Sequence, residues 1–164
     1  MADFFIRSAS FLSRATFAAA SVLLVLLIAL TTYEVVARYV FLAPTIWGLE
    51  VSELINAALF LLAAPFVMLM KGNVVIDILS TRMRPRVSTW ISLLFHLFLL
   101  LPSIALIAGF AAREAWKSYA SGARSLSAWQ APVWTPEALI FIGFALLSLQ
   151  IVAEILKMYF EQKR

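Results

Sequence analysis

One cation and three carboxylates follow the most apolar part of the chain, where residues 15–33 carry no charge at all. These four residues are Glu34, Arg38, Glu50 and Glu53. Their spacing of four and of three positions puts each successive pair on one face of a helix. Paired carboxylates that lie close together can hold a proton or a cation. The stretch could therefore be a proton relay, a substrate site, or the edge of a membrane helix that meets a partner.

Each pair also has a structural interpretation, which we favour over the chemical one. Glu34 and Arg38 can form an ion pair at the end of a helix, and breaking a buried pair is costly because it leaves a lone charge. Glu50 and Glu53, at the start of the next helix, are favoured there by the positive end of the helix dipole. Trp47 suits the aromatic belt that membrane proteins place at the interface.

The chain has one histidine and no cysteine. The lack of cysteine excludes thiol redox chemistry, iron–sulfur clusters and Cys-based zinc sites, and one histidine is too few for bis-histidine haem. His96 lies well inside an apolar run, where an ionisable side chain is by default a functional candidate. A neutral histidine bonded to a neighbouring helix is the commoner case, and we favour it. We expect no cofactor and no metal.

No catalytic constellation accompanies these residues. Serines are plentiful, but the sequence has neither a G-x-S-x-G nucleophile elbow nor a glycine-rich phosphate loop. The basic residues Arg82, Arg84 and Arg86 flank an apolar run, so we expect them to contact membrane lipids and not nucleic acid. The sequence therefore predicts a protein that is not an enzyme.

The elements that position these residues are helices that cross a membrane. The chain is 63% hydrophobic and only 13% charged, whereas soluble domains are about a quarter charged. In hydrocarbon every backbone polar group must bond within its own segment, so each long apolar run is a helix. We predict an all-α integral membrane protein of one domain, residues 1–164, whose four transmembrane helices span about 15–40, 48–71, 87–112 and 136–159.

The lysines and arginines predict the orientation, because positive residues gather on the cytoplasmic side of a membrane. Nine of the 13 fall on the side of both termini and the 71–86 loop. The other four are Arg38, Arg113, Lys117 and Arg124. We expect both termini in the cytoplasm and the 34–53 and 113–136 connections outside. Residues 3–14 are either a short amphipathic helix in the membrane interface or an extension of the first helix.

The later helices contain small and polar residues of the kind that allow close helix approach and interhelical hydrogen bonds. Gly109, Gly143 and Gln150 are among them, and Gln150 needs a partner because it lies in the middle of an apolar run. Four short helices with few charges inside the membrane make a poor self-contained pump. They make a reasonable auxiliary subunit of a larger complex.

Three motifs resemble those of one transporter family. EVVARYVFLAPTIWGLEVSEL is similar to the first signature of the small, DctQ-like membrane subunit of tripartite ATP-independent periplasmic (TRAP) transporters, through Arg38, Tyr39, Phe41, Trp47 and Glu50. KGNVVIDIL is similar to a second, through Gly72, Asn73, Val74, Ile76 and Asp77, with asparagine where the family often has histidine. A looser match comprises Trp129, Pro132, Trp134 and Pro136. The resemblance covers nearly the whole chain.

The resemblance implies a scaffold subunit in a bacterial inner membrane, paired as a heterodimer with a large, DctM-like subunit that holds the substrate and sodium sites. A periplasmic binding protein would deliver an organic acid for sodium symport. We expect subunit-interface or structural roles for Glu34, Arg38, Tyr39, Phe41, Trp47, Glu50, Glu53, Asn73, Asp77 and Gln150. We expect binding-protein docking or membrane-interface roles for Arg113, Lys117, Arg124, Trp129 and Trp134.

The alternative function is a small self-sufficient proton-coupled transporter that uses Glu34, Glu50 and His96. Under this alternative, Glu34→Gln would abolish transport while assembly survives. A membrane enzyme is the least favoured reading of the three.

Overall fold

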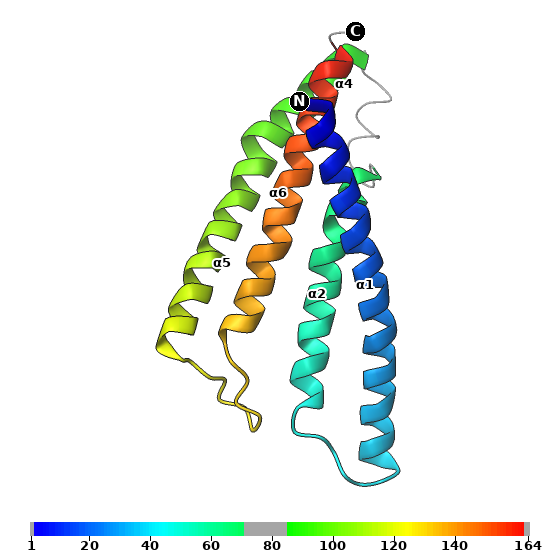
Figure 1. Cartoon of the computed structure of the whole chain (residues 1–164), viewed down its shortest axis with the longest axis vertical. Helices are drawn as coiled ribbons and strands as arrows, with labels where there is room; N and C mark the ends of the chain where they lie inside the picture. The colour runs from blue at the N-terminus through cyan, green and yellow to red at the C-terminus, as the bar shows by residue number, and fades with distance from the viewer. Residues whose placement is uncertain (1, 71–84, 163–164) are drawn as a thin grey trace.

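The computed structural model describes residues 2–70 and 85–162. All of its regular elements are helices (Figure 1): α1 (Ala2–Tyr39), α2 (Gly48–Leu69), α4 (Pro85–Leu94), the π-helix η1 (Phe95–Leu100), α5 (Leu101–Ser121) and α6 (Trp134–Gln162). Four helical segments are long and apolar enough to cross a membrane: Phe4–Tyr39, Gly48–Leu69, Trp90–Ser121 and Trp134–Phe160. The structure is therefore the all-helical architecture that the sequence predicts, with four candidate spans.

The helices alternate in direction, so both chain ends lie at one end of the molecule (Figure 1). The 40–47 connection between α1 and α2 and the 122–133 connection between α5 and α6 lie at the opposite end. We call this opposite end the connection end. Two connections that are distant in the sequence therefore lie at the same end of the molecule.

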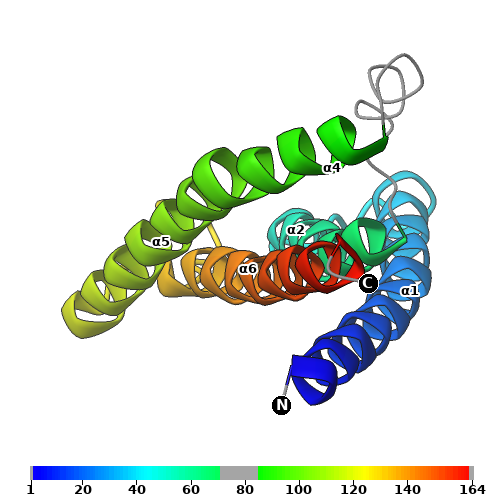
Figure 2. The same ribbon diagram turned by 90° about the horizontal axis from the view of Figure 1, so that it is seen from above.

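Helix α6 holds the other elements together. It packs against α1, α2, α4, η1 and α5, while α1 also packs against α2. Figure 1 shows α6 between α5 on one side and the α1–α2 pair on the other, and seen from above α6 lies in the centre, between α5 and α1 (Figure 2). A small apolar core of Met68, Ile104 and Ile151 joins α2, α5 and α6. The helices thus form an open assembly centred on α6.

Most of the apolar surface faces outward. Within the most apolar window of each candidate span, only 11% to 28% of the residues are buried inside the chain. The backbones of α2 and α5 do not come close to each other, and an apolar groove of about 390 Å³ lies between α2, α6 and the η1–α5 segment. This surface suits contact with lipid or with other membrane helices.

Close approach of α2 and α6 depends on Gly143. A Cβ atom added at this glycine would lie 2.5 Å from the Cβ of Leu61. Gly109, which the sequence suggested for the same role, has no atom within 4 Å of its would-be Cβ. Of these two glycines, only Gly143 brings two helices together.

Several helices are longer than the spans predicted from the sequence. Helix α1 begins at Ala2, so residues 3–14 continue it without a break. Helix α5 extends to Ser121, where Gly122 adopts the left-handed conformation (φ 63°) that ends many helices. Arg113 and Lys117 therefore lie on a helix and not in a loop. A π-helix precedes Pro102, which is where the missing N–H of a proline disturbs regular α-helical bonding.

Candidate functional site

The carboxylate of Glu34 joins the end of α1 to the start of α2. Arg38 donates a hydrogen bond from Nη2 to Oε1 of Glu34 over 3.0 Å. The hydroxyl of Thr45 donates to the other oxygen, Oε2, and itself accepts a bond of 3.0 Å from the backbone N–H of Gly48. We call these four residues the Glu34 junction. Its hydrogen bonds form a continuous chain across the 40–47 connection.

Exposure differs sharply within the ion pair. The side chain of Glu34 is 13% exposed, whereas that of Arg38 is 51% exposed. The carboxylate is thus enclosed and makes its side-chain hydrogen bonds to Arg38 and Thr45, inside the junction, while the guanidinium reaches the surface. This arrangement uses the Glu34 carboxylate to fix backbone geometry, which is a structural role.

Gly48 is buried at the centre of the junction and has no room for a side chain. A Cβ atom there would lie 2.6 Å from Oε2 of Glu34 and would also collide with Oγ1 of Thr45. Sequence reasoning missed both Thr45 and Gly48. The sequence did contain a local signal, because Thr45 lies three positions before Gly48, the first residue of α2.

The end of α1 is closed by backbone bonds before Pro44 is reached. The N–H groups of Val40 and Phe41 donate to the carbonyl of Val36 at 2.9 and 3.3 Å, and that of Ala43 donates to Ala37 at 3.0 Å. Leu42 has the left-handed φ of 52°, a conformation usually taken by glycine at helix ends. The 40–47 connection is therefore a bonded turn held in a defined conformation.

The other predicted residues of this stretch lie around the junction without joining it. Glu50 is half-buried in the first turn of α2, and Glu53 is exposed one turn later. Among the described residues neither carboxylate has a hydrogen bond or an ion pair to a side chain. Trp47 directly precedes α2, and Tyr39 and Phe41 are exposed. The Glu34–Arg38 pair and the Glu50–Glu53 pair therefore share no hydrogen bond or ion pair and do not form one site.

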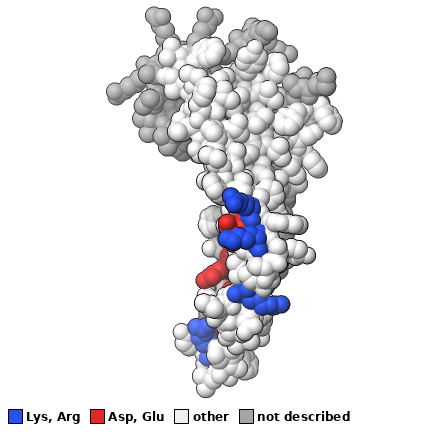
Figure 3. All heavy atoms as spheres, turned by 90° about the vertical axis from the view of Figure 1, so that its left-hand side faces the viewer, with Lys and Arg blue, Asp and Glu red and all other residues white. Residues whose placement is uncertain are grey.

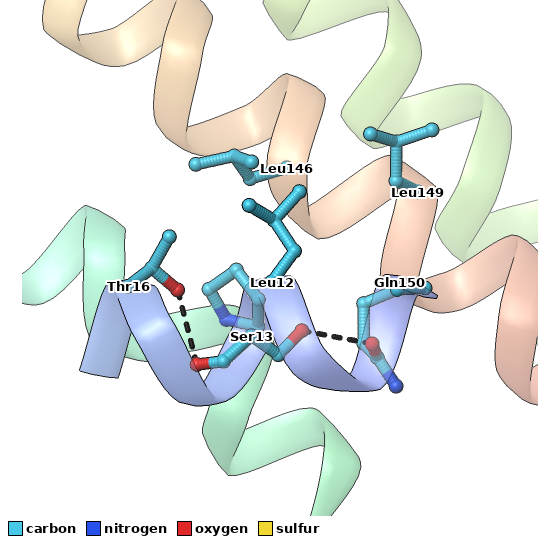
Figure 4. A pocket seen from close by; sticks show the side chains of 8 residues that line it. Leu12, Ser13, Thr16, Leu146, Leu149 and Gln150 are labelled. Atoms are coloured by element: carbon cyan, nitrogen blue, oxygen red, sulfur yellow. Dashed lines mark hydrogen bonds between the residues drawn. The ribbon is translucent and has the colours of Figure 1, made fainter. Parts of the chain in front are cut away.

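Gln150 forms the polar contact that the sequence requires of it. Its side chain is 1% exposed, and its Oε1 accepts a 2.8 Å hydrogen bond from the hydroxyl of Ser13 (Figure 4). Thr16 and Pro65 line the same place, where a cavity of about 10 Å³ lies between α1, α2 and α6. The bond ties the N-terminal part of α1 to α6, and sequence reasoning missed Ser13 as the partner.

His96 is buried in η1, but its side chain bonds to a backbone carbonyl of the preceding helical turn. Its Nδ1 lies 2.6 Å from the carbonyl oxygen of Ser92, four residues earlier. The expected bond to a neighbouring helix is not the one observed, because the preceding carbonyl already supplies the acceptor. His96 also lies in an element that does not pack against α1, so Glu34, Glu50 and His96 do not share a site.

The second half of the connection end carries charge and aromatic side chains. On the side that α5 occupies, basic and acidic side chains gather on the lower half of the molecule (Figure 3). Lys117 pairs with Glu114 at 3.3 Å, and Arg124 donates to the carbonyl of Gln130 at 3.2 Å. Trp134 meets the ring of Tyr119 edge-on, with 5.8 Å between ring centroids. These contacts order an exposed, charged surface.

The 122–133 connection is itself bonded like a short hairpin. Ser125 donates to Ala131 at 2.8 Å and Val133 donates to Ala123 at 3.1 Å, on either side of an isolated bridge between Arg124 and Pro132. Trp129 is exposed near the tip of this hairpin. The surface of the connection end is therefore held in place by backbone bonds on both of its halves.

Two predicted residues, Asn73 and Asp77, lie outside the described residues. Among those that the structure does describe, no three histidine or acidic side chains are grouped so that they could hold a metal ion.

The comparisons with known proteins agree with the architecture. A family model described as "Tripartite ATP-independent periplasmic transporters, DctQ component" matches residues 27–160 of the chain. This range includes the Glu34 junction, the charged end of α5 and nearly all of α6. Neither the curated proteins nor the solved structures gave a significant match.

Proposed function

The chain belongs to the DctQ component family of TRAP transporters, and we propose that it is the scaffold subunit that pairs with and stabilises the large transport subunit. It is a membrane protein of a transporter family, and not an enzyme. Membership of the DctQ component family implies that the chain has partner TRAP subunits. The proposal concerns what this chain contributes to them.

The small share of apolar surface that the chain buries by itself carries the proposal. Three quarters or more of the residues in the apolar windows of α1, α2 and the Trp90–Ser121 segment are not buried, and a groove of about 390 Å³ remains open between three of the helices. A second membrane subunit would cover part of this surface. The Glu34 junction and the Ser13–Gln150 bond would keep the covered face rigid, which lowers the cost of association.

Further features of the proposal follow from the family resemblance and the charge distribution. Both termini would face the cytoplasm of a bacterium, and the connection end would face the periplasm across the inner membrane. The complete transporter would take up an organic acid by sodium symport. The substrate would be delivered by the binding protein and would pass through the large subunit.

Co-expression of the chain with its proposed partner, the large, DctM-like subunit, tests the proposal. We expect a tag on this chain to retain the large subunit through purification. In proteoliposomes, uptake should require both subunits, the binding protein and a sodium gradient, whereas this chain alone should be inactive. Activity of the isolated chain would instead support the self-sufficient transporter. The structure gives that alternative little support, because His96 lies in η1, which packs on neither α1 nor α2, the helices that carry Glu34 and Glu50.

The charged end of α5, together with the 122–133 connection that follows it, is the surface that we propose for docking the binding protein. Arg113, Lys117 and Arg124 are exposed there, and exposed charges mainly change the rate of association and its dependence on salt. We expect the triple change to glutamate to raise the binding-protein concentration needed for half-maximal uptake by about tenfold. Purification with the large subunit should be unchanged.

Uptake at several salt concentrations, measured with the purified complex, checks this prediction. Lys157→Glu, compared with Lys117→Glu alone, is the matched control, because the two changes alter the net charge equally and Lys157 lies near the opposite end of α6, away from the proposed docking surface. An equal effect of Lys157→Glu would show that the total charge matters and that docking at α5 does not.

A further inference from the structure

Large apolar side chains are concentrated in and beside the short 40–47 connection. Six of them are between 65% and 82% exposed: Tyr39, Val40, Phe41, Leu42, Ile46 and Leu49. We call this set the outer apolar loop. Soluble surfaces seldom expose so many apolar side chains together, and a set of this kind marks a site of interaction.

The charges on α1 and α2 place this loop beyond the hydrocarbon of the membrane. The uncharged residues 15–33 of α1 are about 28 Å long at 1.5 Å per residue, which matches a hydrocarbon core of about 30 Å. Glu34 marks the outer edge of the hydrocarbon core on α1, and Glu53 marks the same edge on α2. Every residue of the outer apolar loop follows Glu34 and precedes Glu53, including Tyr39 and Leu49 at the outer ends of the two candidate spans. On this placement its side chains lie outside the depth that acyl chains fill.

Leu42 supplies a second observation. Its backbone has φ 52°, where a side chain is disfavoured and glycine is the usual residue at a helix end. Its side chain is nevertheless 82% exposed and gains little from packing within the chain. The local backbone would be more stable with glycine, so the leucine is unfavourable for the isolated subunit. A contact made outside the chain explains its presence.

We infer that the outer apolar loop is a permanent docking site for the large membrane subunit, on that subunit's periplasmic side and above the hydrocarbon. This inference rests on the proposed function. The binding protein is the less suitable occupant, because it must dissociate in each transport cycle and apolar interfaces are typical of permanent complexes. The Glu34 junction lies at the base of the loop and holds it in the conformation that the partner meets.

Cysteine labelling tests the inference, since the chain has no cysteine of its own. We expect a water-soluble maleimide to label Leu42→Cys readily in the lone subunit in lipid nanodiscs. In the complex with the large subunit, labelling should be slower by about tenfold, because a packed interface excludes the reagent. Leu126→Cys is the matched control: Leu126 is a fully exposed leucine in the 122–133 connection, and its labelling should be equal in both samples.

Leu42→Gly provides an independent measurement. We expect its melting temperature as a lone subunit to be equal to or above that of the wild type, since the backbone strain is relieved. Its affinity for the large subunit should fall by at least about tenfold, the loss that corresponds to one buried leucine. Phe4→Ser, at the opposite end of α1, should leave the affinity unchanged.

The outcomes separate the two proposals. If the wild-type chain does not retain the large subunit, the proposed function is wrong. If it does, but Leu42→Cys is labelled equally in both samples or Leu42→Gly binds like the wild type, the docking site is wrong and the proposed function stands. Poor labelling of the lone subunit in nanodiscs would show that lipid covers the loop, which also overturns the docking site.

Discussion

Replacing Gly143 with alanine is expected to force α2 away from α6 and to destabilise the whole subunit. The added Cβ would lie 2.5 Å from the Cβ of Leu61. Neither atom can rotate away, because each is fixed directly to a helix backbone, so the helices themselves must shift. Overpacking of this kind costs about 1–3 kcal/mol or more. Thermal unfolding in detergent and the yield of monodisperse protein measure the loss.

Gly109→Ala is the matched control for this prediction. No atom lies within 4 Å of the would-be Cβ of Gly109, so alanine should be neutral or slightly stabilising there, since it is the better helix former. In a Leu61→Gly background, Gly143→Ala should cost much less stability than it does in the wild type, because the opposing Cβ is absent. If Gly143→Ala unfolds at the wild-type temperature, the close approach of α2 and α6 is wrong.

Gly48→Ala is expected to break the Glu34 junction and to weaken binding of the large subunit. The new Cβ would occupy the space of Thr45 Oγ1 and Glu34 Oε2. These side chains can move aside only by giving up the hydrogen bonds that define the 40–47 connection. We expect a loss of about 1–3 kcal/mol in stability, measured by thermal unfolding, and less retention of the large subunit in purification.

A double-mutant cycle shows whether the effect passes through the junction. Glu34→Ala alone should lower the melting temperature, but it should add little in a Gly48→Ala background, because both changes remove the same interactions. Glu53→Ala is the matched control, since Glu53 is an exposed carboxylate one turn into α2. Additive effects of Glu34→Ala and Gly48→Ala would contradict a shared junction.

The structure also limits how far the ion pair can be reversed. Exchanging Glu34 and Arg38 keeps the two charges together. An arginine at position 34, however, cannot accept the hydrogen bond that the Thr45 hydroxyl donates to Glu34. We therefore expect the double exchange to be more stable than Arg38→Glu alone, because the ion pair is restored. It should remain less stable than the wild type, because the bond to Thr45 is still lost.

The fold could largely be predicted from the sequence, because long uncharged runs in a membrane allow only helices. The ends of the helices were harder to predict from the sequence. The apolar run of the third span ends at Arg113, yet α5 continues to Ser121, since charged residues are good helix formers once outside the hydrocarbon. Likewise, nothing in the local sequence separates Gly143 from Gly109. Only the position of α2 shows which glycine has a neighbour.

The candidate site could be predicted only in part. The spacing of Glu34 and Arg38 indicated their ion pair, because that contact depends on a single helix. Thr45 is eleven residues from Glu34, and Ser13 is 137 residues from Gln150. Contacts of this kind depend on how the chain turns and on which helices meet, so the residue types alone do not reveal them.

The position of α6 has a consequence for biosynthesis. Among the described helices, α5 packs closely only on α6, apart from η1, which continues directly into α5, and α6 is the last of them to leave the ribosome. Until α6 inserts into the membrane, α1 and α2 can pack on each other, but the Trp90–Ser121 segment has no described helix outside itself to pack on. The subunit can therefore complete its tertiary structure only after translation has passed Gln150, and a nascent chain halted earlier would be an unassembled target for membrane quality control.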